Sequence, residues 1–571
     1  MIKIDVFKGE IPKISDKLLP DGYATTAINC DLKEGSLKPI KGATSVQDIE
    51  AGAQTIYRLG EQWLQWGNKI NVIESLIYES GGRILFTGDN YPKETNLQLA
   101  LVSSPFPTNT RRLGISAPAA AMSTSITVAG SGTDRNIAYC YTRVGLWEDG
   151  TVVESAPSPA TAIFVAKTDA TVRLTDFVDA TETGVFTTHY RIYRINTGDT
   201  GAEYQFVDDL DKTDSPLQYD DSIMDENLGE VLPTDGWTAP IGNLKGILPG
   251  SNGLIFGFND NTVYVTETFI TYTFPDRYKI SVASEIVGLG FNGSAIVVLT
   301  KTVPFLIYGS EPESLSVDRR PFVLPCKSER SIISVLDGVI FSSPPGLAMI
   351  DSGGNARILT EGVFTKEQWE ALGPEKVFSF YYNDAYVAFF EGTNQGIEIK
   401  TGTNEIRRFE TDSPVYGGQY VSTVSINTYD LLDSDSKNFL TSDGYQFLVT
   451  GSPYSLTYDT LYLIQETELA REIVAWESGS IVDYEWKSKE YWTGSVVALT
   501  CGRVVGDFSN GSVVFQLYID DALHFSKTVS NDSPFRIAGP IRGNQFHVML
   551  IGKATVEKIM IGSSMSEVVN V

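Results

Sequence analysis

The motif with the most familiar chemistry in this chain is GLGFNG at residues 288–293, which matches the GxGxxG pattern of dinucleotide-binding loops. Such a loop binds a pyrophosphate where a helix follows it, because the N-terminus of that helix faces the phosphates. Here the residues that follow, SAIVVLT at 294–300, are mostly β-branched or apolar and indicate a strand. We therefore interpret the motif as the turn of a hairpin, and the sequence predicts no cofactor and no cofactor-binding residue.

Two other patterns could hold a metal ion. The segment DSDSK begins like a calcium loop at Asp433 and Asp435, but Lys437 stands where a further oxygen ligand is needed. The four cysteines lie far apart and form no CxxC pair, so they predict neither a zinc site nor a disulfide framework, and we expect small buried residues at Cys30, Cys140, Cys326 and Cys501. The sequence predicts no metal site.

Residues for acid, base or nucleophilic catalysis are not singled out by any pattern. The chain has three histidines. Two of them, His524 and His547, alternate within predicted strands, and His189 lies in the predicted strand 188–198. A Ser-His-Asp arrangement stays open, although no nucleophile-elbow pattern marks a serine. The carboxylates are too numerous to identify an acid/base pair, so a glycosidase also stays open. We predict no catalytic residue and expect a protein that is not an enzyme.

The elements that would position such residues are strands. Short β-branched or aromatic runs alternate with Gly, Asn, Asp or Pro turns, most clearly at residues 252–267, 284–309 and 337–360. This pattern predicts antiparallel hairpins, and repeated hairpins are typical of radially arranged sheets. One short helix is predicted at TKEQWEAL, where Thr365 can cap the helix and Gln368 completes a capping box. The predicted fold class is all-β with a propeller-like central body.

Changes in composition predict separate modules. Residues 113–133 are rich in Ala, Ser, Thr, Gly and Pro, and we interpret them as a linker that leads into a fibronectin-III-like module of several short strands. A strand-rich segment near the end predicts a C-terminal β-sandwich of jelly-roll type. The predicted division is 1–115 for the first part of the propeller-like body, 116–236 for the inserted β-sandwich module, 237–470 for the remainder of the body and 471–571 for the C-terminal β-sandwich.

The charge of the chain is strongly negative. Its 571 residues include 71 acids and 44 bases, for a formal net charge of −27. Such a chain should not wrap nucleic acid, because phosphate binding needs clustered Lys and Arg. The densest acidic run, residues 199–230, contains one base, Lys212. We interpret it as a solvated linker face, with a channel lining or a surface for a basic partner as the alternative. No apolar run predicts a membrane-spanning helix and no secretion signal is expected, so we predict a protein without membrane insertion.

The order of several segments resembles one protein family. Residues 27–39, AINCDLKEGSLKP, carry Ala-x-Asn followed by Gly-x-Leu-x-Pro, and they are followed in order by RIYRINTG, GNLKGILPGSNGLIFGF, VVLTKTVPFLIYG, SSPPGLAMI and DYEWKSK. In these segments, from about residue 7 to residue 566, the chain resembles the tail nozzle family of short-tailed bacteriophages, also called tail tubular protein B. It departs from that family at TYTFP, residues 271–275, where a Pro-His-x-Trp-Pro run is usual.

The resemblance implies a structural virion protein. It implies a homohexamer at the distal end of the tail, whose propeller-like bodies ring a channel for ejected DNA. The implied partners are a tail adaptor or connector protein, tail fibres, and DNA that passes without specific binding. The implied location is the tail of the virion, after assembly in the host cytoplasm. We expect the channel wall to be rich in acids, since such a wall offers no cations to hold phosphates.

Two alternatives to the nozzle stay open. One is a tail fibre or hub adaptor, or a host-glycan-binding tail component, whose terminal sandwich exposes aromatic side chains such as Trp486 and Trp492. The other is an enzyme that depolymerises glycans. A trimer would favour either of these over a ring of six.

Overall fold

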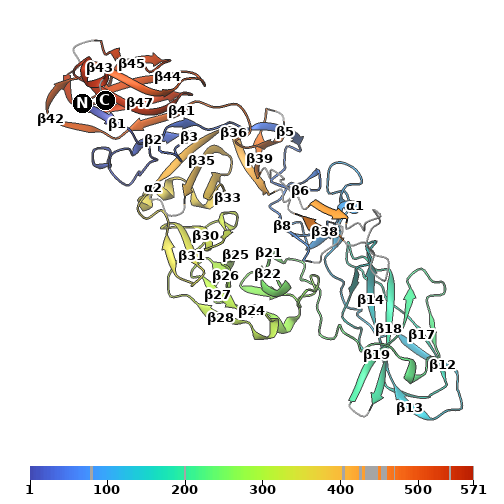
Figure 1. Cartoon of the computed structure of the whole chain (residues 1–571). Helices are drawn as coiled ribbons and strands as arrows, with labels where there is room; N and C mark the ends of the chain where they lie inside the picture. Colours follow the sequence, from blue (N-terminus) through green and yellow to red (C-terminus); the bar gives the residue numbers. More distant parts are fainter. Residues whose placement is uncertain are drawn as a thin grey trace. The chain divides into compact units, whose positions relative to one another are not determined.

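The computed structural model describes residues 1–76, 82–198, 201–400, 405–422, 427–430, 448–451, 459–468, 470–538 and 542–569. The protein is nearly all β, with 50% of its residues in strands and 7% in helices, which confirms the predicted all-β class. It forms two compact units, one made of Met1–Ala51 and Phe380–Val571 and the other of Gly52–Ser379 (Figure 1).

The two ends of the chain belong to the same unit. Strand β1 (Ile2–Ile4) pairs with β48 (Thr555–Gly562), and β2 (Ala24–Ile28) pairs antiparallel with β41 (Tyr484–Ser488). The termini therefore lie side by side in Figure 1. This grouping differs from the predicted division, which places residues 1–115 together. The finer boundaries of that division stay predictions.

The unit Gly52–Ser379 contains a repeated sheet. In four of its antiparallel four-stranded sheets, the strands follow one another in chain order. The first is β8 (Asn71–Glu74), β9 (Ile84–Thr87), β10 (Lys93–Thr95) and β11 (Arg111–Arg112). The second is β21 (Lys245–Pro249), β22 (Ile255–Asn259), β23 (Thr262–Val265) and β24 (Ile280–Ser281). The third is β25 (Ile286–Phe291), β26 (Ile296–Thr300), β27 (Phe305–Tyr308) and β28 (Ser316–Arg319). The fourth is β29 (Ile333–Val335), β30 (Gly338–Ser343), β31 (Gly346–Asp351) and β32 (Ala356–Ile358). These sheets confirm the hairpins predicted for residues 252–267, 284–309 and 337–360.

Successive sheets of this series pack face to face, as β26 shows. All five of its residues are buried. Ile296 and Val298 lie in the core shared with β22 and β23, whereas Val297 and Leu299 lie in the core shared with β30 and β31. Because side chains alternate between the two faces of a strand, this sheet is covered on both sides. A further hairpin, β6 (Thr55–Leu59) with β7 (Gln62–Trp66), precedes the series.

Residues 116–236 form three sheets. One is β12 (Ser123–Val128), β17 (Thr171–Thr175) and β20 (Tyr219–Asp221), and a second is β15 (Val152–Glu154), β14 (Tyr139–Leu146), β18 (His189–Gly198) and β19 (Gly201–Asp211). The third pairs β13 (Asp134–Ile137) with β16 (Phe164–Lys167). Their shared core is rich in aromatic side chains, including Tyr139, Tyr141 and Tyr190. The linker interpretation of residues 113–133 is wrong for the part that forms β12.

The other unit contains a 13-stranded sheet and a four-stranded one. The large sheet includes β2, β41 and these strands: β5 (Thr44–Ile49), β33 (Val377–Tyr382), β34 (Ala385–Phe390), β35 (Thr393–Lys400), β36 (Ile406–Val421), β39 (Thr460–Glu466), β40 (Arg471–Ala475), β42 (Tyr491–Ala498), β44 (Val513–Ile519), β45 (Ala522–Val529) and β47 (Arg542–Gly552). The small sheet is β1, β48, β43 (Cys501–Asp507) and β46 (Phe535–Arg536). Two short pairs are β3 (Cys30–Asp31) with β4 (Lys38–Pro39), and β37 (Asn427–Asp430) with β38 (Leu448–Gly451).

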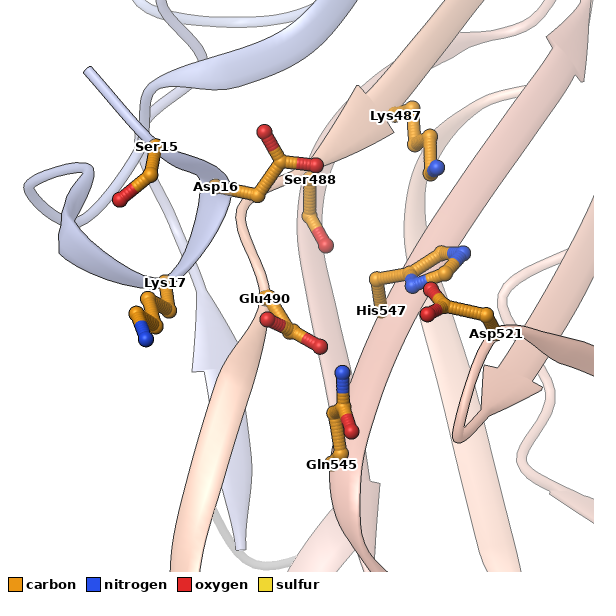
Figure 2. Close-up of a pocket in the computed structure, with 9 residues that line it drawn as sticks. All are labelled: Ser15, Asp16, Lys17, Lys487, Ser488, Glu490, Asp521, Gln545 and His547. Carbon is orange, nitrogen blue, oxygen red and sulfur yellow. The ribbon is translucent and has the colours of Figure 1, made fainter.

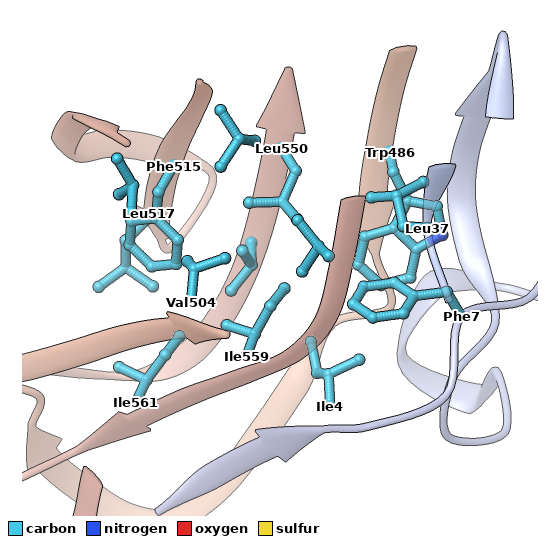
Figure 3. Close-up of a cluster of buried hydrophobic side chains, with 14 of the residues drawn as sticks. Ile4, Phe7, Leu37, Trp486, Val504, Phe515, Leu517, Leu550, Ile559 and Ile561 are labelled. Carbon is cyan, nitrogen blue, oxygen red and sulfur yellow. The ribbon is translucent and has the colours of Figure 1, made fainter. Parts of the chain in front are cut away.

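One core joins both sheets of this unit. Figure 3 shows the ring of Phe7 against the indole of Trp486, and the same core includes Val504 and Ile559 of the small sheet and Leu550 of the large sheet. These side chains come from both ends of the chain. Their burial therefore holds the N-terminal segment onto the C-terminal strands.

The described helices are short. The predicted helix is confirmed as α2 (Lys366–Ala371), where the Gln368 amide N–H donates to the Thr365 hydroxyl and the Thr365 amide N–H donates to the Gln368 side chain. The others are α1 (Leu97–Ala100) and α3 (Met565–Val569), with 3₁₀ turns η1 (Asp16–Leu18), η2 (Asp225–Asn227), η3 (Ser251–Gly253), η4 (Asp276–Tyr278), η5 (Pro312–Ser314), η6 (Glu329–Ser331) and η7 (Pro374–Lys376).

Candidate functional site

The GxGxxG segment at residues 288–293 lies in β25 and in the turn that leads to β26. Inside that turn the side-chain carbonyl of Asn292 accepts hydrogen bonds from the amides of Ser294 and Ala295, and its amide donates to the backbone of Asp351. A strand follows where a dinucleotide site needs a helix. The hairpin interpretation is confirmed.

Of the two patterns considered for metal binding, only the cysteines lie in the described part of the chain. All four cysteines are buried, as predicted, and burial raises the pKa of Cys140 and of Cys326 to about 12. The calcium-like segment at Asp433 lies outside the described residues. Within the described residues, no group of three or more His, Cys, Asp or Glu side chains is arranged to hold a metal ion. No helix in the described part of the chain is long and apolar enough to span a membrane.

The acidic run at residues 199–230 is folded into the inserted module. It forms β19, β20 and η2, so the run is not a linker. Most of its acids are nevertheless exposed, as expected of a solvated face. The carboxylate of Asp221 is fully buried, where it contacts the Arg194 guanidinium at 2.5 Å and accepts a hydrogen bond from the Tyr139 hydroxyl at 2.7 Å. Arg194 also donates to Asp225 at 3.0 Å.

A second ion cluster lies on the neighbouring strands. Arg191 donates to both carboxylate oxygens of Asp209, at 2.9 and 3.1 Å, and to Glu154 at 3.1 Å. The buried Glu154 also accepts hydrogen bonds from the hydroxyls of Tyr193 and Thr142, each at 2.7 Å. Arginines from neighbouring strands thus neutralise part of the acidic run. The carboxylates that are paired with arginines therefore bind the strands of the module to one another and are not free negative charges.

The two tryptophans expected on the surface differ in burial. Trp486 is wholly buried, so the expectation that it is exposed is wrong. Trp492 is 55% exposed, which agrees with the expectation. The alternation of residues in YEWKS already indicated that Trp486 is buried. Trp486 shares its face of the strand with Tyr484 and not with the charged Glu485 and Lys487.

The candidate site is a polar pocket of about 280 Å³ (Figure 2). It lies in the unit made of Met1–Ala51 and Phe380–Val571, which we call the terminal unit. Four separate elements form it: η1 at the N-terminal side, the end of β41, the turn between β44 and β45, and β47. Its lining residues are Ser15, Asp16, Lys17, Lys487, Ser488, Glu490, Asp521, Gln545 and His547. Hydrogen bonds fix this arrangement, since the Glu490 amide donates to the Asp16 carbonyl at 3.2 Å and the Asp520 amide donates to the Gln545 carbonyl at 3.2 Å.

His547 is the most unusual residue of this pocket. Its side chain is only 5% exposed, and its ring stacks on Tyr518 with 4.6 Å between centroids and 18° between planes. Among the described residues, its Nε2 atom has no hydrogen-bond partner although it is buried. Burial, together with the positive charge of Lys487, lowers the pKa of His547 to about 4. The negative charges of Asp521 and Asp16 act in the opposite direction and raise this pKa, but their effect is smaller. The imidazole is therefore neutral near pH 7.

This depressed pKa predicts a loss of stability in mild acid. Between pH 6.5 and pH 4 the unfolded chain binds a proton at His547 that the folded protein does not bind, so the free energy of unfolding falls as the pH falls through this window. In urea denaturation, we expect the free energy of unfolding of wild type to fall by about 2–3 kcal/mol more than that of His547→Gln between pH 7.5 and pH 4.5. His524→Gln, at an exposed histidine of β45, should behave as wild type. Identical pH profiles for wild type and His547→Gln would contradict this account.

The sequence did not predict this pocket. His547 was assigned to a strand, and this is confirmed by its place in β47. Its neighbours come from segments far apart in the chain, and no local spacing brings Asp16 to Asp521. The alternation of Gln545 with His547 along one strand was the one local signal.

Comparisons with known proteins identify no family. No family model matches the chain, and no curated protein matches it either. Solved structures similar to parts of it include BBS1N in complex with ARL6DN, at 7% identity and a TM-score of 0.29, covering 76% of this chain and 96% of that one. The WD40 domain of Toxoplasma gondii coronin aligns at 7% identity and a TM-score of 0.25, over 62% of this chain and 88% of that one. An exo-β-1,3-galactanase from Phanerochaete chrysosporium aligns at 8% identity and a TM-score of 0.18, over 68% of this chain and 100% of that one. At such low TM-scores these likenesses carry no argument about what this chain does.

Proposed function

We propose that this chain is the tail nozzle of a short-tailed bacteriophage, a structural virion protein that forms the distal channel for DNA ejection and a platform for fibres. Six copies form a ring, bound to a tail adaptor or connector protein above and to fibres at the side. The face-to-face series of four-stranded sheets serves as a β-propeller-like body. The module at residues 116–236 is fibronectin-III-like, and the terminal strands form a β-sandwich.

The pairing between the two ends of the chain is the observation that carries this proposal. The AINCDLKEGSLKP segment and the DYEWKSK segment are among those that resemble the nozzle family, and they lie more than 400 residues apart in the sequence. In the structure β2 and β41 are neighbours, with Ala27 opposite Trp486. Two segments that resemble the nozzle family, far apart in the sequence, are thus neighbours in one sheet. This is expected if the resemblance to that family reflects a common fold.

The charge of the chain is consistent with a DNA conduit. A net charge of −27 per copy, repeated six times around a ring, repels a passing polyanion. Screening confines this repulsion to roughly 8–10 Å at physiological salt, so it acts where the channel is narrow. The wall then has no cluster of cations that could hold phosphates.

Electron microscopy of the purified protein and of intact particles tests the proposal. We expect a closed six-fold ring of about 376 kDa, six times the 62.6 kDa of the chain, with acidic side chains along its inner wall. A monomer within intact particles, a trimer, or a cationic inner wall would each contradict the nozzle function.

A further inference from the structure

Strand β12 lies at the edge of a sheet in the module at residues 116–236 (Figure 1). The order of strands in that sheet is β12, β17 and β20, so β12 pairs with β17 along one side. Within the described residues, no backbone hydrogen bond joins the other side of β12 to the protein. An edge that leaves its N–H and C=O groups unpaired is a template on which a further strand can pair.

The sequence of β12, STSITV, lacks the features that usually protect such an edge. It contains no charged residue and no proline, and four of its six residues are β-branched. A register shift against β17 occurs between Ile126 and Val128, near the end of the strand. The pairing from Ser123 to Ile126 is regular, and five of the six residues are exposed. Most of β12 is therefore accessible to another chain.

A pocket of about 410 Å³ lies beside this edge. Its walls come from residues 121–126, which include the first part of β12, and from residues 160–164, which lead into β16. β16 is also at the edge of its sheet, since it pairs with β13 alone. The pocket thus lies between two edge strands.

The core of the module is incompletely covered at this pocket. Because alternate residues share a face of a strand, Thr124 and Ile126 project from the same side as Met122, just before β12. Met122 is buried in the core at 4% exposure, whereas Ile126 is 45% exposed. In the other wall, Phe164 packs against the same core and is half-buried. Apolar side chains of an added strand would remove the remaining surface of Ile126 and Phe164 from water.

The charges around the edge select the kind of partner. All residues that line the pocket are uncharged, so the segment that enters it is uncharged too, since burying an unpaired charge costs free energy. The module around the pocket is acidic, with 20 acids and 7 bases among residues 116–236. A second copy of this chain brings the same negative charge and is repelled, whereas a segment flanked by Lys or Arg is attracted.

We propose that β12 is a docking edge for an extended segment of a partner protein, uncharged where it meets the six residues of β12 and flanked by Lys or Arg. The segment pairs with β12 through main-chain hydrogen bonds and adds a strand to the sheet. Every second side chain of the segment enters the pocket and packs against Ile126 and Phe164. This surface goes beyond the nozzle function and does not depend on it, because one module of one chain supplies all the residues named.

Fluorescence anisotropy of labelled peptides with the full-length protein tests this surface. Each peptide has two Lys at each end and a central segment as long as β12, in which Thr alternates with Val, Ile or Phe. We expect at least one peptide to bind with a Kd of about 10–100 μM. Binding should also slow the amide hydrogen exchange of residues 123–128 about tenfold, because the added strand pairs with the edge. The same peptide N-methylated at all central residues has lost its main-chain donors and should bind about tenfold more weakly.

A substitution at the edge provides the second arm of the test. Ile126→Lys brings a charge to the wall of the pocket and should weaken the Kd about tenfold. Val152→Lys is the matched control, since it introduces the same charge at another exposed position of the module, in β15, and should leave the Kd unchanged. Circular dichroism confirms that each variant is folded, and the hydrogen exchange of wild type needs no variant.

Each other outcome overturns the docking edge. It is overturned if no peptide binds to wild type, or if binding survives both N-methylation and Ile126→Lys. Equal binding of peptides that end in Glu in place of Lys would exclude the basic partner. A dimer of wild type that Ile126→Lys dissociates, measured by sedimentation, would assign the edge to a second copy of the chain. A six-fold ring without peptide binding would leave the nozzle function intact and remove this surface alone.

Discussion

Replacing Arg194 by methionine is expected to lower the free energy of unfolding of the inserted module by about 3–5 kcal/mol, because it leaves a charge buried without its partner. The guanidinium and the carboxylate of Asp221 are 1% and 0% exposed, and they are the centre of a cluster that includes Tyr139 and Asp225. Methionine fills a similar volume but offers no donor. Urea denaturation, followed by hydrogen exchange of the amides in β14 and β18, measures the change.

The neighbouring residue provides a matched control. Asp220 is adjacent to Asp221 in the same strand, and it forms an ion pair of the same chemical type with Arg173 at 2.7 Å, but on the surface. Arg173→Met should leave the urea midpoint nearly unchanged, since exposed ion pairs contribute little to stability. If both variants lose the same stability, burial is not what gives the Arg194 cluster its importance.

Local features of this fold could be predicted from the sequence. The turn at Asn383 and Asp384 lies between two apolar strands, and both residues adopt positive φ, as Asn and Asp do in tight hairpins. The capping box of α2 was likewise visible in the spacing of Thr365 and Gln368. In each case the signal lies within a few residues of the structure it specifies.

Features that depend on distant partners could not be predicted. The run at residues 199–230 looks like a linker because it is acidic, and only the fold shows that Arg191 and Arg194 neutralise part of it. The pocket of His547 combines η1 with strands from the other end of the chain, which no local period reveals. Whether a strand belongs to one sheet or another depends on pairing across hundreds of residues, and the sequence pattern is the same in both cases.

Replacing Trp486 by alanine is expected to destabilise the terminal unit by about 3–5 kcal/mol, the usual cost of removing a large aromatic side chain from a core. The indole is wholly buried and meets the ring of Phe7 edge to face, with 4.9 Å between centroids. Its Nε1–H also donates to the Lys8 carbonyl at 3.2 Å, so the substitution loses packing and a partly buried hydrogen bond together. Urea denaturation, read by near-ultraviolet circular dichroism, measures the change.

Trp492→Ala is the matched control, because the same side chain is removed from a position that is 55% exposed in the same unit. We expect its urea midpoint to stay close to that of wild type, as is usual for a surface substitution. The N-terminal segment reaches the terminal strands through Phe7 and Lys8, so Trp486→Ala should also increase hydrogen exchange at the amides of β2. Unchanged protection of β2 together with a large loss of stability would show that Trp486 supports the terminal strands without holding the N-terminal segment to them.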